Sequence, residues 1–157
     1  MKFFNLIIFF ILFSFSSVFV NAKQAMKLQG AWQLVSQKID GKDHPIAGRQ
    51  IKLVTAGHFA WIQQDKKQLE ELLAKGTAHD SAVAYHDMAG AGTYKVSGNT
   101  FTETTEFFYD PQNIGTSIDW KFKLEGKFWY TSGHYVHYKD GKKIEDILLE
   151  QVWKKIE

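Results

Sequence analysis

The sequence predicts an all-β fold: a closed up-and-down antiparallel β-barrel of about eight strands, with one short inserted helix. Short runs of alternating apolar and polar residues recur along the chain, which is typical of strands with one buried face. Turn signals such as Gly98-Asn99 and Asp140-Gly141 separate most of these runs, so consecutive strands should pair as hairpins. No layer of helices is predicted to cover the apolar face, so the sheet is expected to close on itself. An open sandwich is the alternative.

The first 22 residues have the pattern of a secretory signal peptide. Lys2 gives a positive start, Phe3 to Val20 is an apolar run, and Val20-Asn21-Ala22 is a small-x-small cleavage site. We therefore expect residues 1–22 to be removed and residues 23–157 to form one barrel domain, secreted or periplasmic, with no stable membrane anchor. An uncleaved anchor is the alternative, because the run is long enough to span a bilayer.

Composition narrows the classes of function. The chain has no cysteine, which excludes disulfides, thiolate metal sites and lipid attachment at a cysteine. Lysines are spread along the sequence without a basic stripe, so nucleic acid is not an expected partner. The sequence leaves the oligomeric state open.

The hairpin around Gly98-Asn99 gives the clearest strand register. A two-residue turn between Thr93–Ser97 and Thr100–Phe108 pairs Val96 with Phe101 and Tyr94 with Glu103. Because faces alternate along a strand, the apolar face is predicted to carry Tyr94, Val96, Phe101, Glu103, Thr105, Phe107 and Tyr109. A carboxylate on such a face needs a partner. We therefore expect Glu103, opposite Tyr94, to be protonated or paired with a cation.

A second hairpin is predicted around Ala56-Gly57, between Arg49–Thr55 and His58–Gln64. Its more consistently apolar face is expected to be the inner one, although a bulge would reverse this. That face carries Ile51, Leu53, His58, Ala60 and Ile62, and the opposite face carries Lys52, Val54, Phe59 and Trp61.

The other predicted strands are Leu28–Ile39, Ser117–Leu124, Phe128–Tyr138 and Ile144–Lys155. Ile118, Trp120, Phe122 and Leu124 alternate cleanly with polar residues and are expected to face inward. Asp65–Lys75 changes to helical spacing, with Asp65 as N-cap and one leucine stripe, and Thr77–Gly92 is predicted to be loop.

Five short motifs, taken in order, carry a resemblance to a known superfamily: Gly30-Ala31-Trp32, His58-Phe59-Ala60-Trp61, Gly90-Ala91-Gly92-Thr93-Tyr94, Gly98–Glu103 and Glu150–Lys154. From Leu28 to the C-terminus the chain resembles the calycin superfamily, and it is most similar to short lipocalin-like domains of unknown function in secreted bacterial proteins. The resemblance implies a barrel that binds a small apolar ligand. Lipocalins usually place a late arginine on the first-strand tryptophan. Here the only arginine is Arg49, so either Lys154 or Lys155 takes that place or the contact is absent.

The expected function is binding of a small apolar or amphipathic molecule inside the barrel. The residues expected to bind it are Tyr94, Glu103, Phe101, Thr105, Phe107, Trp120, Phe122 and His58. A structural Tyr94–Glu103 tie, a His58–Glu103 acid–base pair in a small enzyme, and a filled barrel with an envelope role are the alternatives.

No catalytic residue, metal ligand or cofactor is expected. The chain lacks the nucleophile-elbow, P-loop and His-Glu-x-x-His motifs. A metal or haem site is the alternative, formed from His58, His79, His86, His134 and His137. The histidines show no helical pair, however, and His134 and His137 differ in parity, so they should face opposite sides of a strand.

Overall fold

The computed structural model describes residues 23–46, 48–65, 88–108, 111–139 and 141–157. A helical segment at 23–28 precedes nine strands and one short 3-10 helix, η1 (Pro111–Asn113). No helix in these ranges is long and apolar enough to cross a membrane. The strands are β1 (Gly30–Ile39), β2 (Lys42–Asp43), β3 (Gly48–Val54), β4 (His58–Asp65), β5 (Met88–Ser97), β6 (Thr100–Phe108), β7 (Ser117–Glu125), β8 (Phe128–Lys139) and β9 (Lys142–Lys155).

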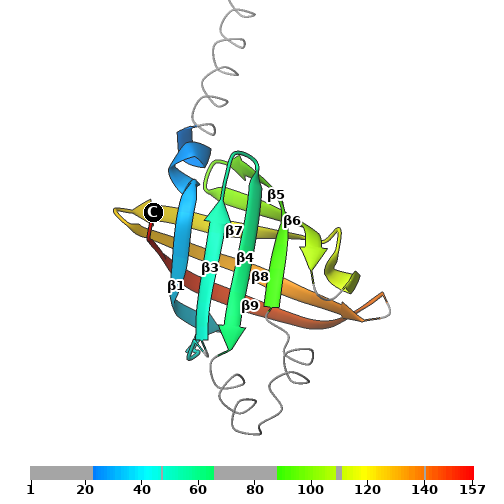
Figure 1. The fold of residues 1–157 in the computed structure, drawn as a ribbon. Helices are drawn as coiled ribbons and strands as arrows, with labels where there is room; N and C mark the ends of the chain where they lie inside the picture. Colours follow the sequence, from blue (N-terminus) through cyan, green and yellow to red (C-terminus); the bar gives the residue numbers. More distant parts are fainter. Residues whose placement is uncertain (1–22, 47, 66–87, 109–110, 140) are drawn as a thin grey trace, which may run out of the picture.

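The sheet closes into an eight-stranded antiparallel barrel, as the sequence predicts. From β3 to β9 each strand pairs with the next, and β1 pairs with both β3 and β9, so the circle has no free edge. The short β2 extends from β1 outside this circle. Figure 1 shows β1, β3 and β4 crossed by β7, β8 and β9 on the other side of the barrel.

Two predicted segments differ from the structure or lie outside it. Strand β5 begins at Met88, so the predicted loop ends before Gly92. Asp65 is the last residue of β4, and the rest of the predicted helix Asp65–Lys75 lies outside the described residues, as do residues 1–22.

The β5–β6 hairpin has the predicted register up to a bulge. Tyr94 pairs with Glu103 and Gly92 with Thr105, as the turn predicts, but Ala91 pairs with Phe107, so Glu106 is an extra residue on β6. At Gly92 a side chain is excluded, because a Cβ there would lie 1.9 Å from the backbone oxygen of Thr104. The bulge turns Phe107 outward, where it is 69% exposed, so its predicted inward position is wrong.

The β3–β4 hairpin also has the predicted register, with Val54 opposite Phe59, but the face chosen as inner is wrong. Val54 and Phe59 are buried, whereas Leu53 and Ile62 are 50% and 59% exposed. The physical reason is Lys52. Because Lys52 is charged, the face that it shares with Phe59 was expected to be the outer one. Its side chain is instead buried inside the barrel and ion-paired with Glu103.

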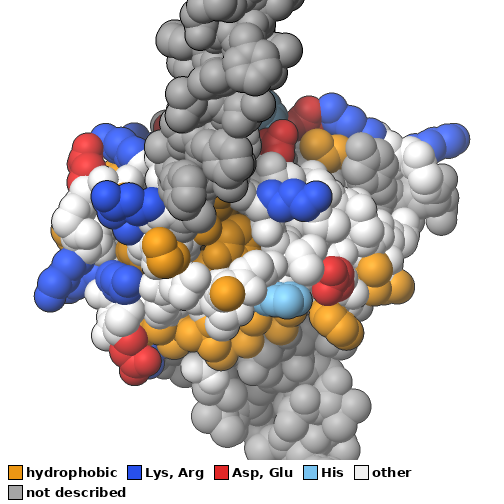
Figure 2. Space-filling model, turned by 90° about the horizontal axis from the view of Figure 1, so that it is seen from above, with side chains coloured by type: hydrophobic (Ala, Val, Ile, Leu, Met, Phe, Trp, Pro, Cys, Tyr) orange, Lys and Arg blue, Asp and Glu red, His pale blue; other side chains and the backbone are white. Residues whose placement is uncertain are grey.

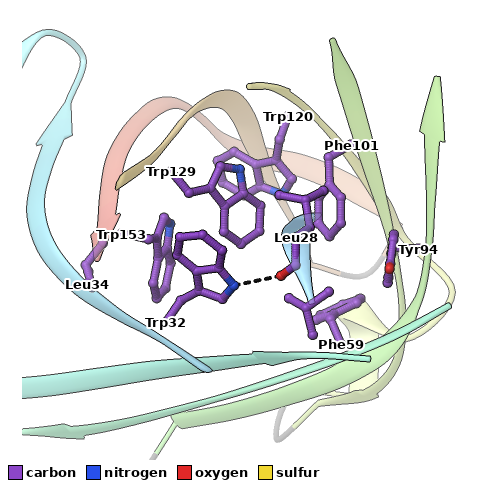
Figure 3. Packing of buried hydrophobic residues seen from close by; sticks show 10 residues of the cluster. Leu28, Trp32, Leu34, Phe59, Tyr94, Phe101, Trp120, Trp129 and Trp153 are labelled. Carbon is purple, nitrogen blue, oxygen red and sulfur yellow. Dashed lines mark hydrogen bonds between the residues drawn. The ribbon is translucent and has the colours of Figure 1, made fainter. Parts of the chain in front are cut away.

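One end of the barrel is filled by aromatic side chains. The largest fully buried side chains are Trp32, Trp129, Trp153, Phe101 and Leu28. Figure 3 shows them facing one another, and the Nε1 of Trp32 donates a hydrogen bond to the backbone oxygen of Leu28 at 2.7 Å. The segment 23–28 thus closes the end from which β1 starts.

The tryptophan of the first strand, Trp32, has a cation on its ring. The cation comes from Lys155, one of the two lysines that the sequence offered for this contact. Lys155 Nζ lies 5.3 Å from the centre of the Trp32 ring and donates to the backbone oxygen of Gln29 at 2.8 Å. The contact joins the last strand to the residues just before the first.

Candidate functional site

A cavity of about 690 Å³ occupies the barrel interior beyond the aromatic end. It extends toward the end of the barrel where β4 finishes and β5 begins, since Gln63 and Met88 line it. Apolar and polar side chains line it in similar numbers, and most of the polar groups are uncharged. The apolar and aromatic lining includes Phe59, Trp61, Phe108, Ile118, Trp120, Ile147, Leu149 and Trp153, and the polar lining includes Gln50, Lys52, Gln63, Glu103, Thr105 and Gln151.

An ion pair lies where the cavity meets the aromatic end. Lys52 on β3 and Glu103 on β6 point inward from strands that are not neighbours, and Lys52 Nζ lies 2.7 Å from Glu103 Oε1. Their side chains are only 5% and 6% exposed. Burial at this level requires that each charge be paired, because an isolated buried ion is strongly disfavoured.

Trp120 completes the set of partners around the carboxylate. Its Nε1 donates to Glu103 Oε2 at 3.0 Å, so each carboxylate oxygen accepts a hydrogen bond. Gly133 on β8 makes room for this ring, because a Cβ at Gly133 would lie 2.8 Å from Trp120 Cε3. The tryptophan is therefore held in place both by the carboxylate and by the neighbouring strand.

Aromatic rings surround the Lys52 ammonium. Its Nζ lies between 4.9 and 5.9 Å from the centres of four rings, a distance range typical of cation–π contacts. The rings belong to Phe59, Trp120, Trp129 and Trp153. The inner end of the cavity thus combines one neutralised charge pair with a dense aromatic surface.

Tyr94 does not contact Glu103 through its hydroxyl, although the two residues are paired across the strands as predicted. The Tyr94 hydroxyl instead donates to the backbone oxygen of Thr55 at 2.8 Å. Burial raises the pKa of the Tyr94 phenol, and a backbone hydrogen bond from Gly57 partly offsets the rise. The predicted structural tie between Tyr94 and Glu103 is therefore replaced by a tie between β5 and the β3–β4 turn.

The other residues predicted to bind a ligand are divided between three places. Glu103, Thr105 and Trp120 line the cavity. Phe101 and Tyr94 are buried in the aromatic core, and Phe122 packs against that core on the inner side of β7, as the alternation predicts. Phe107 and His58 are exposed on the outside, so neither can belong to an interior site, and the alternative His58–Glu103 pair is wrong.

Several cavity residues were missed by reasoning from the sequence. Lys52, Phe59 and Trp61 belong to the strand face that was expected to be outer. The large aromatic side chains of Phe59 and Trp61 were the available signal that this face is the inner one. An ion pair between Lys52 and Glu103 would have explained how a lysine could share that face. Gln151 and Trp153 fit the period-two alternation of β9, but nothing in the sequence indicated that they line a cavity.

The histidines are separated as their parity predicts. His137 lines the cavity, whereas exposed His134 contacts Asp146, with Nδ1 2.8 Å from Oδ1. Within the described residues, no three histidine or acidic side chains are grouped as a metal site would require. His79 and His86 lie outside the described residues.

The barrel end that carries residues 23–28 presents side chains of both charges. Figure 2 shows Lys and Arg side chains scattered over this face among Asp, Glu and apolar groups, not gathered into one patch. The interior cavity is therefore the best-defined candidate site in the described part of the chain.

Comparison of the sequence with protein-family models and with curated proteins finds no match.

Proposed function

We propose that this protein binds a small apolar or amphipathic molecule inside its barrel and acts outside the cytoplasm after export. The observation that carries the proposal is the cavity of about 690 Å³, which lies within the size range of small-molecule sites. Its apolar and aromatic side chains would bury the body of a ligand, and its polar side chains would orient the polar part. A barrel filled completely by side chains, as a purely structural role would allow, would not leave such a space.

Two further features support a lipocalin-like function. The closed eight-stranded barrel is large enough to hold one small ligand. Lys155 lies on the Trp32 ring, in the manner of the arginine–tryptophan contact that the resemblance implies. The fold alone is compatible with many activities, so the cavity lining carries the functional argument. Export rests on the N-terminal sequence pattern.

The test uses an uncharged fluorescent probe, N-phenyl-1-naphthylamine, whose emission increases in apolar surroundings. The mature protein should bind it saturably, with one site per chain. Ile118→Trp places a larger side chain at a half-buried position that lines the cavity, and should weaken probe binding about tenfold or more.

Ile62→Trp is the matched control, because Ile62 is 59% exposed on the outside of the barrel. It should leave probe affinity unchanged. The proposal is wrong if the native protein shows no saturable binding, or if the two variants affect binding equally. If the proposal holds, native mass spectrometry of protein purified without denaturant should identify the natural ligand by its mass.

A further inference from the structure

We propose that the cavity selects ligands whose polar group is uncharged, and that the Lys52–Glu103 pair is the determinant of this selectivity. The inference rests on the proposed binding function and assigns the chemical class of the ligand: an apolar body that carries a neutral hydrogen-bonding group such as an amide, hydroxyl or carbonyl.

Charge balance at the inner end of the cavity is the first argument. Lys52 and Glu103 neutralise each other at 2.7 Å, and both carboxylate oxygens already accept hydrogen bonds, from Lys52 and Trp120. A ligand carboxylate would have to compete with Glu103 for one cation. A ligand ammonium would have to compete with Lys52 for one carboxylate. Either would bring an unbalanced charge into a site removed from water, which is costly.

The surroundings of Lys52 are the second argument. Four aromatic rings lie within 5.9 Å of its Nζ, so the ammonium is enclosed by ring faces and edges on several sides. Such rings stabilise a cation but offer nothing to an anion that approaches it, because the ring face is itself negative. The pair is thus isolated from additional ions.

The remaining polar lining is the third argument. The buried part of the wall carries amide and hydroxyl groups, which can both donate and accept hydrogen bonds, among them Gln50, Thr105 and the hydrogen-bonded pair Gln37 and Gln151. The ionisable side chains Glu145 and His44 also line the cavity, but they are exposed. His137 is half-buried there.

The experiment compares three ligands with the same chain and different charge at neutral pH: decanamide, decanoate and decylammonium. Affinities are measured by displacement of N-phenyl-1-naphthylamine from the mature protein. Decanamide should bind about tenfold more tightly than either charged ligand. Equal affinities, or tighter binding of a charged ligand, would overturn the inference. If the probe binds but the three ligands do not follow this ranking, the selectivity inference is wrong and the proposed binding function is still supported. If the probe does not bind at all, the proposed binding function itself is contradicted.

Charge-changing variants test the role of the pair. Glu103→Gln gives the inner end a net positive charge and should shift the preference toward decanoate. Lys52→Met gives it a net negative charge and should shift the preference toward decylammonium. Glu125→Gln is the matched control, since it breaks an exposed pair in which Lys123 Nζ lies 3.0 Å from Glu125 Oε1. It should not alter the ranking.

If the two interior variants fold and keep the native ranking, the pair is not the selectivity determinant and the inference fails. Circular dichroism and thermal unfolding verify folding. If one variant does not fold, the shift in ranking of the other variant decides the role of the pair.

Discussion

Lys52 and Glu103 are the charged side chains among the buried residues that the structure describes. They come from positions 51 residues apart in the sequence and meet inside the barrel at 2.7 Å. Pairing a buried charge removes most of the cost of its burial, but deletion of one partner restores that cost to the other. This asymmetry gives the pair a measurable signature.

Single and double substitutions should be strongly non-additive at this pair. Lys52→Met and Glu103→Gln should each lower the free energy of unfolding by about 3–5 kcal/mol, because each leaves one buried charge unpaired. The double variant Lys52→Met/Glu103→Gln should recover most of that loss. Urea unfolding measures all three.

The exposed pair Lys123–Glu125 provides the control for this cycle. Its side chains are 61% and 58% exposed, so Lys123→Met should change stability by no more than about 1 kcal/mol. Additive losses in the interior double variant would contradict the view that the two charges stabilise each other.

Tyr94 gives a prediction at alkaline pH. Burial raises its pKa above the ordinary value of 10.0, so the folded state keeps the phenol proton at a pH where the unfolded state loses it. The stabilisation from Tyr94 is therefore complete below pH 10 and decreases as the pH rises through the raised pKa. At pH 7, Tyr94→Phe should cost about 1 kcal/mol through loss of the bond to Thr55.

The measurement is urea unfolding of the native protein and Tyr94→Phe at a series of pH values from 7 to 11. Other groups titrate in both proteins, so the difference in their stability isolates Tyr94. That difference should shrink above pH 10. A difference that stays constant or grows would show that the phenol is not protected by burial.

At the scale of the strand, the hairpin register was predictable and its interruption was not. The turn at Gly98-Asn99 fixes Val96 opposite Phe101, and the structure confirms that pairing. The extra residue Glu106 then reverses the alternation, so that Phe107 faces solvent and Phe108 lines the cavity. A bulge has little sequence signal of its own here, because it depends on the close approach of Gly92 to Thr104.

Two phenylalanines on β6 provide a matched test of the bulge. Phe101→Ala should lower the free energy of unfolding by about 3–5 kcal/mol, since the side chain is fully buried among Tyr94 and Trp129. Phe107→Ala should change it by only about 0.5 kcal/mol, as expected for an exposed side chain. Similar losses at both positions would indicate the unbulged register in which Phe107 faces inward.

At the scale of the whole molecule, barrel closure joins the two ends of the described chain. Strand β9 pairs with β1, and Lys155 contacts both the Trp32 ring and the backbone of Gln29. The same tryptophan holds the segment 23–28 through Leu28. One lysine thus connects the last strand, the first strand and the closing segment.

Lys155→Ala should therefore lower the free energy of unfolding by about 1–2 kcal/mol, because one hydrogen bond and one cation–π contact are lost. Lys155→Arg keeps a cation at this position and should retain most of the native stability. Lys154→Ala is the control, because the neighbouring Lys154 is exposed. Thermal unfolding of the three variants provides the comparison. Equal effects at both lysines would contradict the assigned role of Lys155.

The sequence by itself determined the fold class and most strand positions of this protein, because period-two alternation and turn residues are local signals. It also determined that Glu103 faces inward and needs a partner. Only the tertiary structure decided which partner. Lys52 looked like a solvent-facing residue within its own strand, and the inner face of the β3–β4 hairpin was assigned wrongly for that reason.

The cavity likewise depends on closure. Its lining comes from all eight barrel strands, and no local pattern states how far those strands' side chains fill the space between them. Burial of a charge is a property of a pair, and the volume of a barrel interior is a property of the closed sheet. Both are set by residues that are distant in sequence, so they could be read only from the folded molecule.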